Sequence, residues 1–267
     1  MVAGACSRRV GPCGRQEVFP AGRPLRVDTP PPAPSEDPVR LPPPARLTLP
    51  LALGAYFVGL VLTAIAVAQM VEDGAGIDSM DGVETFVSSL PLFLSLAGGA
   101  LVIPALGGLS PASALRLDRF RWYDVPAGLV GGAVAQLALI PIYAPVLRFV
   151  DDDVSTAARQ LTDRFSDSEI WLLVLMVVVV APVCEELFFR GLVQGGLERS
   201  LPTVPALLLS AVIFGAVHFQ LLQFLGLGLF GLVLAVALNR TGRLSVTIFL
   251  HMGFNLMGVA GLLAERL

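Results

Sequence analysis

Four polar side chains of this 267-residue chain lie embedded in strongly apolar sequence: Glu185, His218, His251 and Asn255. A carboxylate can take a proton from water, as a general base does in hydrolysis. Histidine and asparagine can donate hydrogen bonds to the oxyanion that forms when water attacks a carbonyl group. Because ionisable groups inside apolar membrane segments are costly, they mark function by default. The set therefore predicts a buried hydrolytic site, although each residue taken alone is also typical of hydrogen bonding between helices.

The two adjacent glutamates have different expected roles. On a helix that turns 100° per residue, Arg190 lies about 40° around the axis from Glu186 but about 140° from Glu185. Glu186 and Arg190 are thus expected to form a structural ion pair, with the acid on the favourable N-terminal side. Glu185 points elsewhere and lacks a local partner, which suits a general base.

The two histidines are the only histidines in the chain. His251 and Asn255 are four residues apart and share a helix face, so Asn255 is expected to support His251 at an oxyanion. A rise of ~1.5 Å per residue places Glu185 and His218 at similar depths, roughly 20 Å from the same end of their segments. The groups can therefore meet in one site.

Pro182 lies three residues before Glu185 and removes one helix hydrogen bond. It is either an ordinary membrane kink or a means of opening space for water beside Glu185, and the sequence leaves both interpretations open.

The elements that carry these residues are predicted to be membrane-spanning helices. The chain is 55% hydrophobic and only 15% charged, with a mean hydropathy of +0.76, whereas soluble domains are about 25% charged. Long apolar stretches with few charges indicate membrane spans, and Gly128 and Gly132, one turn apart, would permit close helix packing. We expect an all-α polytopic bundle over 47–267 with about seven spans, near 47–71, 86–109, 125–147, 169–198, 203–220, 222–239 and 244–263.

The remainder of the chain bears on its location. Residues 1–46 are rich in proline and arginine and are predicted to be a disordered tail. Arginines are frequent in this tail and in the connection 110–124 but absent from 72–85, which places the N-terminus in the cytoplasm. A net charge of -3 gives no footprint for nucleic acid. The absence of lysine favours a bacterial source, and hence a multi-pass protein of the plasma membrane.

Three ordered motifs resemble a known family. They read Glu-Glu-x-x-x-Arg, Phe-x-x-x-His and His-x-x-x-Asn, each on an apolar helix, and comprise Glu185-Glu186 to Arg190, Phe214 to His218 and His251 to Asn255. In this order they resemble the CAAX-protease and bacteriocin-processing family of intramembrane endopeptidases, which includes the type II CAAX prenyl endopeptidase. The resemblance covers about residues 165–260 as a catalytic core, and the first three spans match only as generic apolar helices.

The resemblance implies an endopeptidase that hydrolyses membrane-associated proteins or peptides. It implies that Glu185 activates water with the aid of His218, that His251 and Asn255 stabilise the oxyanion, and that the motif's second acid and arginine hold the site together. The implied partners are a membrane-bound substrate and the lipid bilayer.

The resemblance leaves the mechanism open between a glutamate type without a cofactor and a metal-dependent type. Glu185, His218 and His251 could bind zinc, but the spacing His-Glu-x-x-His of soluble zinc proteases is absent. We favour the metal-free mechanism. Two alternatives to an enzyme are a catalytically silent membrane scaffold or immunity-type protein, and a proton or ion transporter. The transporter is disfavoured because no inverted repeat with matching broken helices is found.

Overall fold

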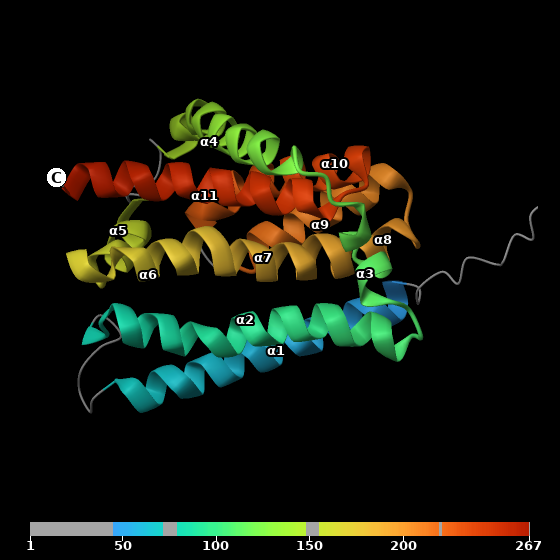
Figure 1. The fold of residues 1–267 in the computed structure, drawn as a ribbon, viewed down its shortest axis with the longest axis horizontal. Helices are drawn as coiled ribbons and strands as arrows, with labels where there is room; N and C mark the ends of the chain where they lie inside the picture. The colour runs from blue at the N-terminus through green and yellow to red at the C-terminus, as the bar shows by residue number, and fades with distance from the viewer. Residues whose placement is uncertain (1–44, 72–78, 148–154, 219–220, 267) are drawn as a thin grey trace, which may run out of the picture. The chain divides into compact units, whose positions relative to one another are not determined.

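The computed structural model describes residues 45–71, 79–147, 155–218 and 221–266, and all of its regular structure in these ranges is helical. The predicted tail 1–46 therefore lies almost wholly outside the described residues. The elements, shown in Figure 1, are α1 (Ala45–Met70), α2 (Gly82–Leu106), α3 (Pro111–Ala114), η2 (Leu117–Arg119), α4 (Asp124–Leu147), α5 (Ser155–Asp163), η3 (Asp167–Glu169), α6 (Ile170–Val174), η4 (Leu175–Val180), α7 (Ala181–Glu185), η5 (Glu186–Gln194), α8 (Gly195–Glu198), α9 (Thr203–Ala216), α10 (Leu221–Thr241) and α11 (Leu244–Arg266).

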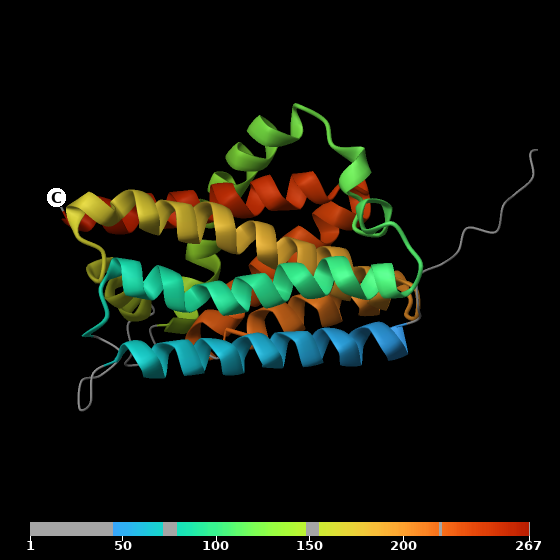
Figure 2. The same cartoon turned by 60° about the horizontal axis from the view of Figure 1, so that its bottom comes forward.

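The predicted all-α membrane bundle is confirmed. In the part of the chain that the structure describes, six helical stretches are long and apolar enough to cross a membrane, and they coincide with six of the seven predicted spans. The stretch predicted at 203–220 is the apolar helix α9, which has only 14 residues and ends at Ala216. Figures 1 and 2 show α1 and α2 lying side by side, with α4 alongside α11.

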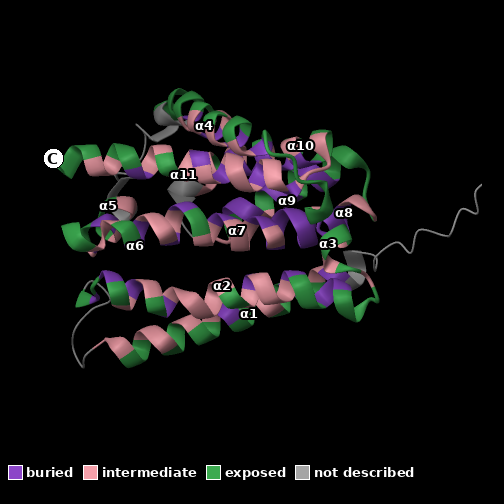
Figure 3. Ribbon diagram, in the orientation of Figure 1, coloured by how far each residue is buried: buried purple, intermediate pink, exposed green. Residues whose placement is uncertain are grey.

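The fourth span, Asp167–Glu198, is the central helix of the bundle. Half of its most apolar window is buried by other helices, against 11% to 28% for the other five spans. Figure 3 shows this concentration of buried residues from α7 to α8. The span is one continuous helix in which α-helical turns alternate with two π-helical segments, η4 and η5. Wider π turns are often found at functional sites, and the second one begins at Glu186.

The fourth span and α10 are joined by side-chain donors that repeat every turn. Arg190 Nη2 donates to the carbonyl oxygen of Gly231 (3.2 Å), and Gln194 Nε2 donates to that of Ala235 (3.0 Å). Both contacts join residues 41 positions apart. Since the offset is constant, the two helices run in the same direction, and their register is held by hydrogen bonds rather than by apolar packing alone.

Glycines allow α4 and α11 to approach until their backbones touch. A Cβ on Gly128 would lie 2.5 Å from the Cβ of Phe249, and one on Gly132 would overlap the carbonyl oxygen of Leu250. From the opposite side, a Cβ on Gly253 would overlap the backbone of Leu129. The close packing predicted for Gly128 and Gly132 is therefore present, and it holds the helix that carries His251.

A buried carboxylate ties the start of α4 to the turn between α10 and α11. Asp124 is 1% exposed and accepts hydrogen bonds from Arg243 Nε at 3.1 and 3.2 Å and from the Ser245 hydroxyl. Gly242 enters this turn with a φ of +63°, a conformation that favours glycine. The hydrogen bonds to Asp124 thus hold the N-terminal end of α11 against α4, and the glycines at the crossing of the two helices hold its middle.

We predict that Gly132→Ala destabilises the protein, because its new methyl group would collide with the backbone of α11. Overpacking of this kind costs about 1–3 kcal/mol, which would lower the midpoint of thermal unfolding in detergent micelles by several degrees. Gly131→Ala is the matched control, since a Cβ there has nothing within 4 Å. Equal unfolding temperatures for the two variants would contradict the close crossing.

Candidate active site

Two opposite charges lie at the centre of the bundle with no exposure to solvent. Arg190 Nε is 3.5 Å from Glu186 Oε2, and both side chains are 0% exposed. The ion pair expected from the helical spacing is therefore present. The guanidinium group also lies 4.2 Å from the ring centroid of Phe214, a cation–π contact. Together with the Gly231 carbonyl, these contacts surround the arginine on three sides.

His251 lies between the two glutamates. Its Nδ1 is 3.0 Å from Glu186 Oε1, and its Nε2 is 3.9 Å from Glu185 Oε2. The side chain of Glu185 is 18% exposed, whereas that of Glu186 is 0% exposed. The structure thus separates the acids as their helical angles predict: Glu186 is enclosed with the arginine, and Glu185 faces a more open space across the same imidazole ring.

The hydrogen-bond partners determine which ring nitrogens carry a proton. An ionised carboxylate only accepts hydrogen bonds, so Nδ1 of His251 donates to Glu186. Nε2 then donates when the ring is doubly protonated and accepts when it is neutral. Oxyanion stabilisation by His251 consequently requires the imidazolium form, whereas metal binding through Nε2 requires the neutral form.

Phe214 connects the two histidines. Its carbonyl oxygen accepts a hydrogen bond from Nδ1 of His218 (2.8 Å), since a carbonyl cannot donate, and this leaves the His218 Nε2 lone pair available in the neutral ring. The Phe214 ring centroid is 5.1 Å from that of His218 and 5.8 Å from that of His251, both edge to face. Within the described residues no hydrogen bond or ion pair joins His218 directly to Glu185.

Asn255 makes its side-chain contact away from the carboxylates. Its Nδ2 donates to the carbonyl oxygen of Val177 in η4, at 2.8 Å. The amide carries two hydrogens, so one remains for another acceptor. The role of Asn255 at an oxyanion stays a prediction.

The described residues contain no group of three His, Cys, Asp or Glu side chains arranged to hold a metal ion. The predicted alternative ligands Glu185, His218 and His251 therefore do not form such a group in this arrangement. The zinc alternative does not fit the side chains as they lie, and we derive no step through a metal.

Tyr56 is a candidate site residue that sequence reasoning missed. Its hydroxyl donates to the carbonyl oxygen of Val217 (2.7 Å), in the turn that carries His218. It comes from α1, a span that the motifs do not reach. The available signal was the one tyrosine of this span, because a buried tyrosine hydroxyl usually finds a partner.

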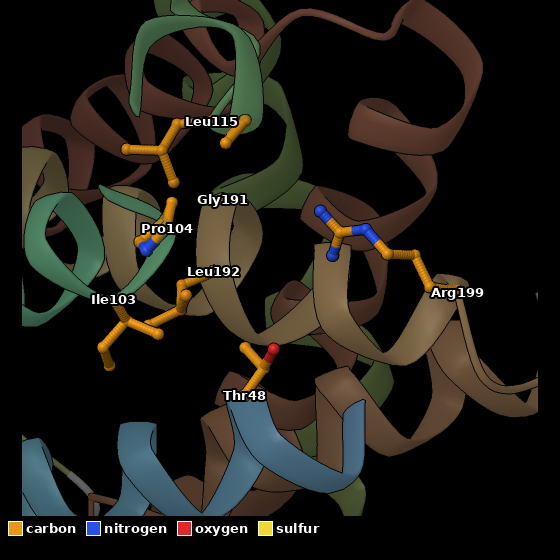
Figure 4. Close-up of a pocket in the computed structure, with 8 residues that line it drawn as sticks. Thr48, Ile103, Pro104, Leu115, Gly191, Leu192 and Arg199 are labelled. Carbon is orange, nitrogen blue, oxygen red and sulfur yellow. The ribbon is translucent and has the colours of Figure 1, made fainter. Parts of the chain in front are cut away.

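A small hollow lies among α1, α2, α3 and the fourth span (Figure 4). Its lining residues are Thr48, Ile103, Pro104, Ala114, Leu115, Gly191, Leu192 and Arg199. None of the candidate catalytic residues lines it. Burial, and then the neighbouring Arg116, lower the pKa of Arg199 at its edge. This hollow is not the site that the motifs predict.

We predict that Glu186→Ala prevents normal folding, because it leaves Arg190 charged and enclosed without its acid. Breaking a buried pair costs about 3–5 kcal/mol. The same substitution one residue earlier, Glu185→Ala, is the matched control and is expected to leave the protein folded. The measurement is the yield of monodisperse protein in detergent. Adding Arg190→Leu to Glu186→Ala should recover part of the yield, and equal yields for both single variants would contradict the assignment.

Comparison with known proteins locates the similarity in the same part of the chain. Residues 167–257 match the family model described as type II CAAX prenyl endopeptidase Rce1-like. The chain is 36% identical over 84 residues to "Putative membrane peptidase YdiL" of Bacillus subtilis, covering 32% of this chain and 34% of that protein. It is 30% identical over 114 residues to "UPF0177 protein YbdI" of Lactococcus lactis subsp. lactis, covering 42% of this chain and 61% of that protein.

The matches thus span between a third and two thirds of these relatives. No solved structure gives a significant match to the chain. All three motifs lie inside the matched range. The resemblance predicted from them is therefore confirmed: over residues 167–257 this chain is similar to the type II CAAX prenyl endopeptidase Rce1-like family.

Proposed function

We propose that this protein is an intramembrane endopeptidase that uses Glu185 to activate water. The observation that carries the proposal is the position of His251 between a half-open and a fully enclosed carboxylate. Glu185 can then accept and release a proton, while Glu186 orients the imidazole ring of His251. The family similarity over residues 167–257 and the name of the Bacillus relative support a peptidase in the membrane.

In the proposed reaction, Glu185 takes a proton from water as the water oxygen attacks the peptide carbonyl carbon. The negative charge that develops on the carbonyl oxygen accepts a hydrogen bond from Nε2 of protonated His251. Collapse of the tetrahedral intermediate breaks the C–N bond, and Glu185 returns the proton to the leaving amine. Glu185 is then ionised again, so the cycle needs no further reactant. In a low-dielectric cavity such donors act more strongly than in water.

The remaining site residues have supporting roles in this proposal. His218 keeps an Nε2 lone pair in its neutral form and can hold the attacking water. Asn255 is predicted to be a second oxyanion donor through the amide hydrogen that Val177 does not use. Glu186, Arg190 and Phe214 hold the imidazole and the carboxylate in place.

The proposed substrates are membrane-associated proteins or peptides, because the carboxylates lie in a span that is long and apolar enough to cross the bilayer. The proposed location is the plasma membrane of a bacterium, which the absence of lysine supports, with the N-terminus in the cytoplasm, which the arginine distribution supports. If the protein has these residues but cleaves no substrate, it is the catalytically silent scaffold considered above.

We predict that Glu185→Gln abolishes cleavage while the protein remains folded. Loss of a general base lowers rates by about 10²–10⁴-fold. The measurement is comparative peptidomics of membranes that contain equal amounts of the wild type or the variant. Glu265→Gln is the matched control, since it removes a carboxylate that is 61% exposed at the far end of α11. Identical peptide profiles for wild type and Glu185→Gln would favour the silent scaffold.

We predict that removal of metal leaves the activity intact, because the mechanism uses only protein side chains. Purified protein dialysed against a strong chelator, and checked by elemental analysis, should retain its rate on a peptide identified by the peptidomic comparison. Loss of activity that zinc restores would instead support the ligand set Glu185, His218 and His251.

A further inference from the structure

Pro182 interrupts the hydrogen-bond pattern of the fourth span at one identifiable carbonyl group. The N–H of Ala181 bonds to the carbonyl of Met176, five residues earlier, as in a π-helix. In the same register, the N–H of residue 182 would bond to the carbonyl of Val177. Proline has no N–H. The Val177 carbonyl is therefore left without its helical partner, in a segment that is apolar enough to lie within a membrane.

Asn255 supplies the missing donor from another helix. Its Nδ2 is 2.8 Å from the Val177 oxygen. A backbone carbonyl inside the apolar layer cannot accept a hydrogen bond from bulk water, so a donor within the protein is required. The proline also accounts for the wider turns of η4, because its ring would collide with the carbonyl four residues earlier in a tight α-helix.

This contact is one of several polar contacts between α11 and the fourth span. One turn earlier on α11, His251 bonds to Glu186. The glycine crossing with α4 already fixes the middle of α11, and the contacts to the fourth span, one turn apart, set which face of α11 is turned toward the carboxylates. That face carries the imidazole ring that meets both carboxylates.

We propose that Pro182 and Asn255 act as a pair: the proline exposes the carbonyl of Val177, and Asn255 binds it and so holds His251 in register with Glu185 and Glu186. Asn255 is thereby a positioning residue, whether or not it also contacts substrate. The consequence for catalysis rests on the proposed peptidase function, but the pairing itself does not.

The test is a double-mutant cycle in the full-length protein. Asn255→Leu keeps the size of the side chain and removes the donor, and Pro182→Ala gives residue 182 an N–H of its own. Pro91→Ala in α2 replaces Pro182→Ala in a control cycle. Each variant is measured for thermal unfolding in micelles, for hydrogen exchange over residues 175–186, and for product peptides in membranes.

We expect Asn255→Leu alone to lower the unfolding temperature by about 2–10 °C, as for a buried carbonyl left without a partner. It should also speed hydrogen exchange around Val177 and reduce product peptides. In a protein that already carries Pro182→Ala, Asn255→Leu should lower the unfolding temperature by less than half as much as it does in the wild type. Product should recover in part relative to Asn255→Leu, because the position of His251 is restored, while the loss of the predicted oxyanion donor remains. In a protein that carries Pro91→Ala, Asn255→Leu should cause the same loss of unfolding temperature and of product as in the wild type.

Additive losses in the Pro182→Ala cycle would overturn the pairing. Recovery of stability without recovery of product would overturn the positioning role. If Asn255→Leu cannot be purified, a folded double variant with Pro182→Ala supports the pairing, and failure of both to fold overturns it. Coupled stabilities in a protein that yields no product in any form would leave the pairing intact and reject the peptidase function instead.

Discussion

The site depends on a charged pair that the protein encloses completely in an apolar bundle. Neither Glu186 nor Arg190 is exposed, and removing two ions from water costs more than their mutual attraction returns unless further groups satisfy them. The structure supplies such groups from three other helices, Phe214, the Gly231 carbonyl and His251, while Nε and Nη1 of Arg190 have no hydrogen-bond partner within the described residues. Each neighbour is thereby held at a defined position, so the pair determines where the imidazole ring lies.

The rest of the bundle keeps these helices from sliding. Donors of the fourth span bind successive turns of α10, which fixes the height of the phenylalanine and carbonyl groups around the arginine. Glycine contacts bring α4 against α11 with no side chains between the backbones, and Asp124 with Arg243 closes one end of that pair. By contrast, α1 presents most of its surface outward. It reaches the site through the Tyr56 hydroxyl, which binds the turn that holds His218.

Much of this arrangement follows from the sequence alone. Span positions could be predicted because composition over some twenty residues determines whether a helix can cross a membrane. The contact of Glu186 with Arg190 could be predicted because it is local to one helix. The contacts of Tyr56 and Asn255 could not, because their partners are backbone carbonyls more than 70 positions away that carry no signature of residue type. The wider turns of η4 could not be predicted for a related reason, because they depend on which carbonyl Pro182 leaves free and on which residue binds it; no residue type in the sequence marks those of η5.

The shortness of α9 has a consequence for the depth at which its last turn lies. Its 14 residues span about 21 Å, whereas the hydrocarbon layer is about 30 Å thick. The helix starts beside the end of the fourth span, so the turn at Val217 and His218 is reached before the opposite surface of the layer. Backbone that is not helical is tolerated at such depth only inside protein or along a water-filled cavity. A helix that stops early thus does more than carry a histidine: it leaves backbone groups that need partners from other helices, and the Tyr56 hydroxyl of α1 binds one of them, the Val217 carbonyl.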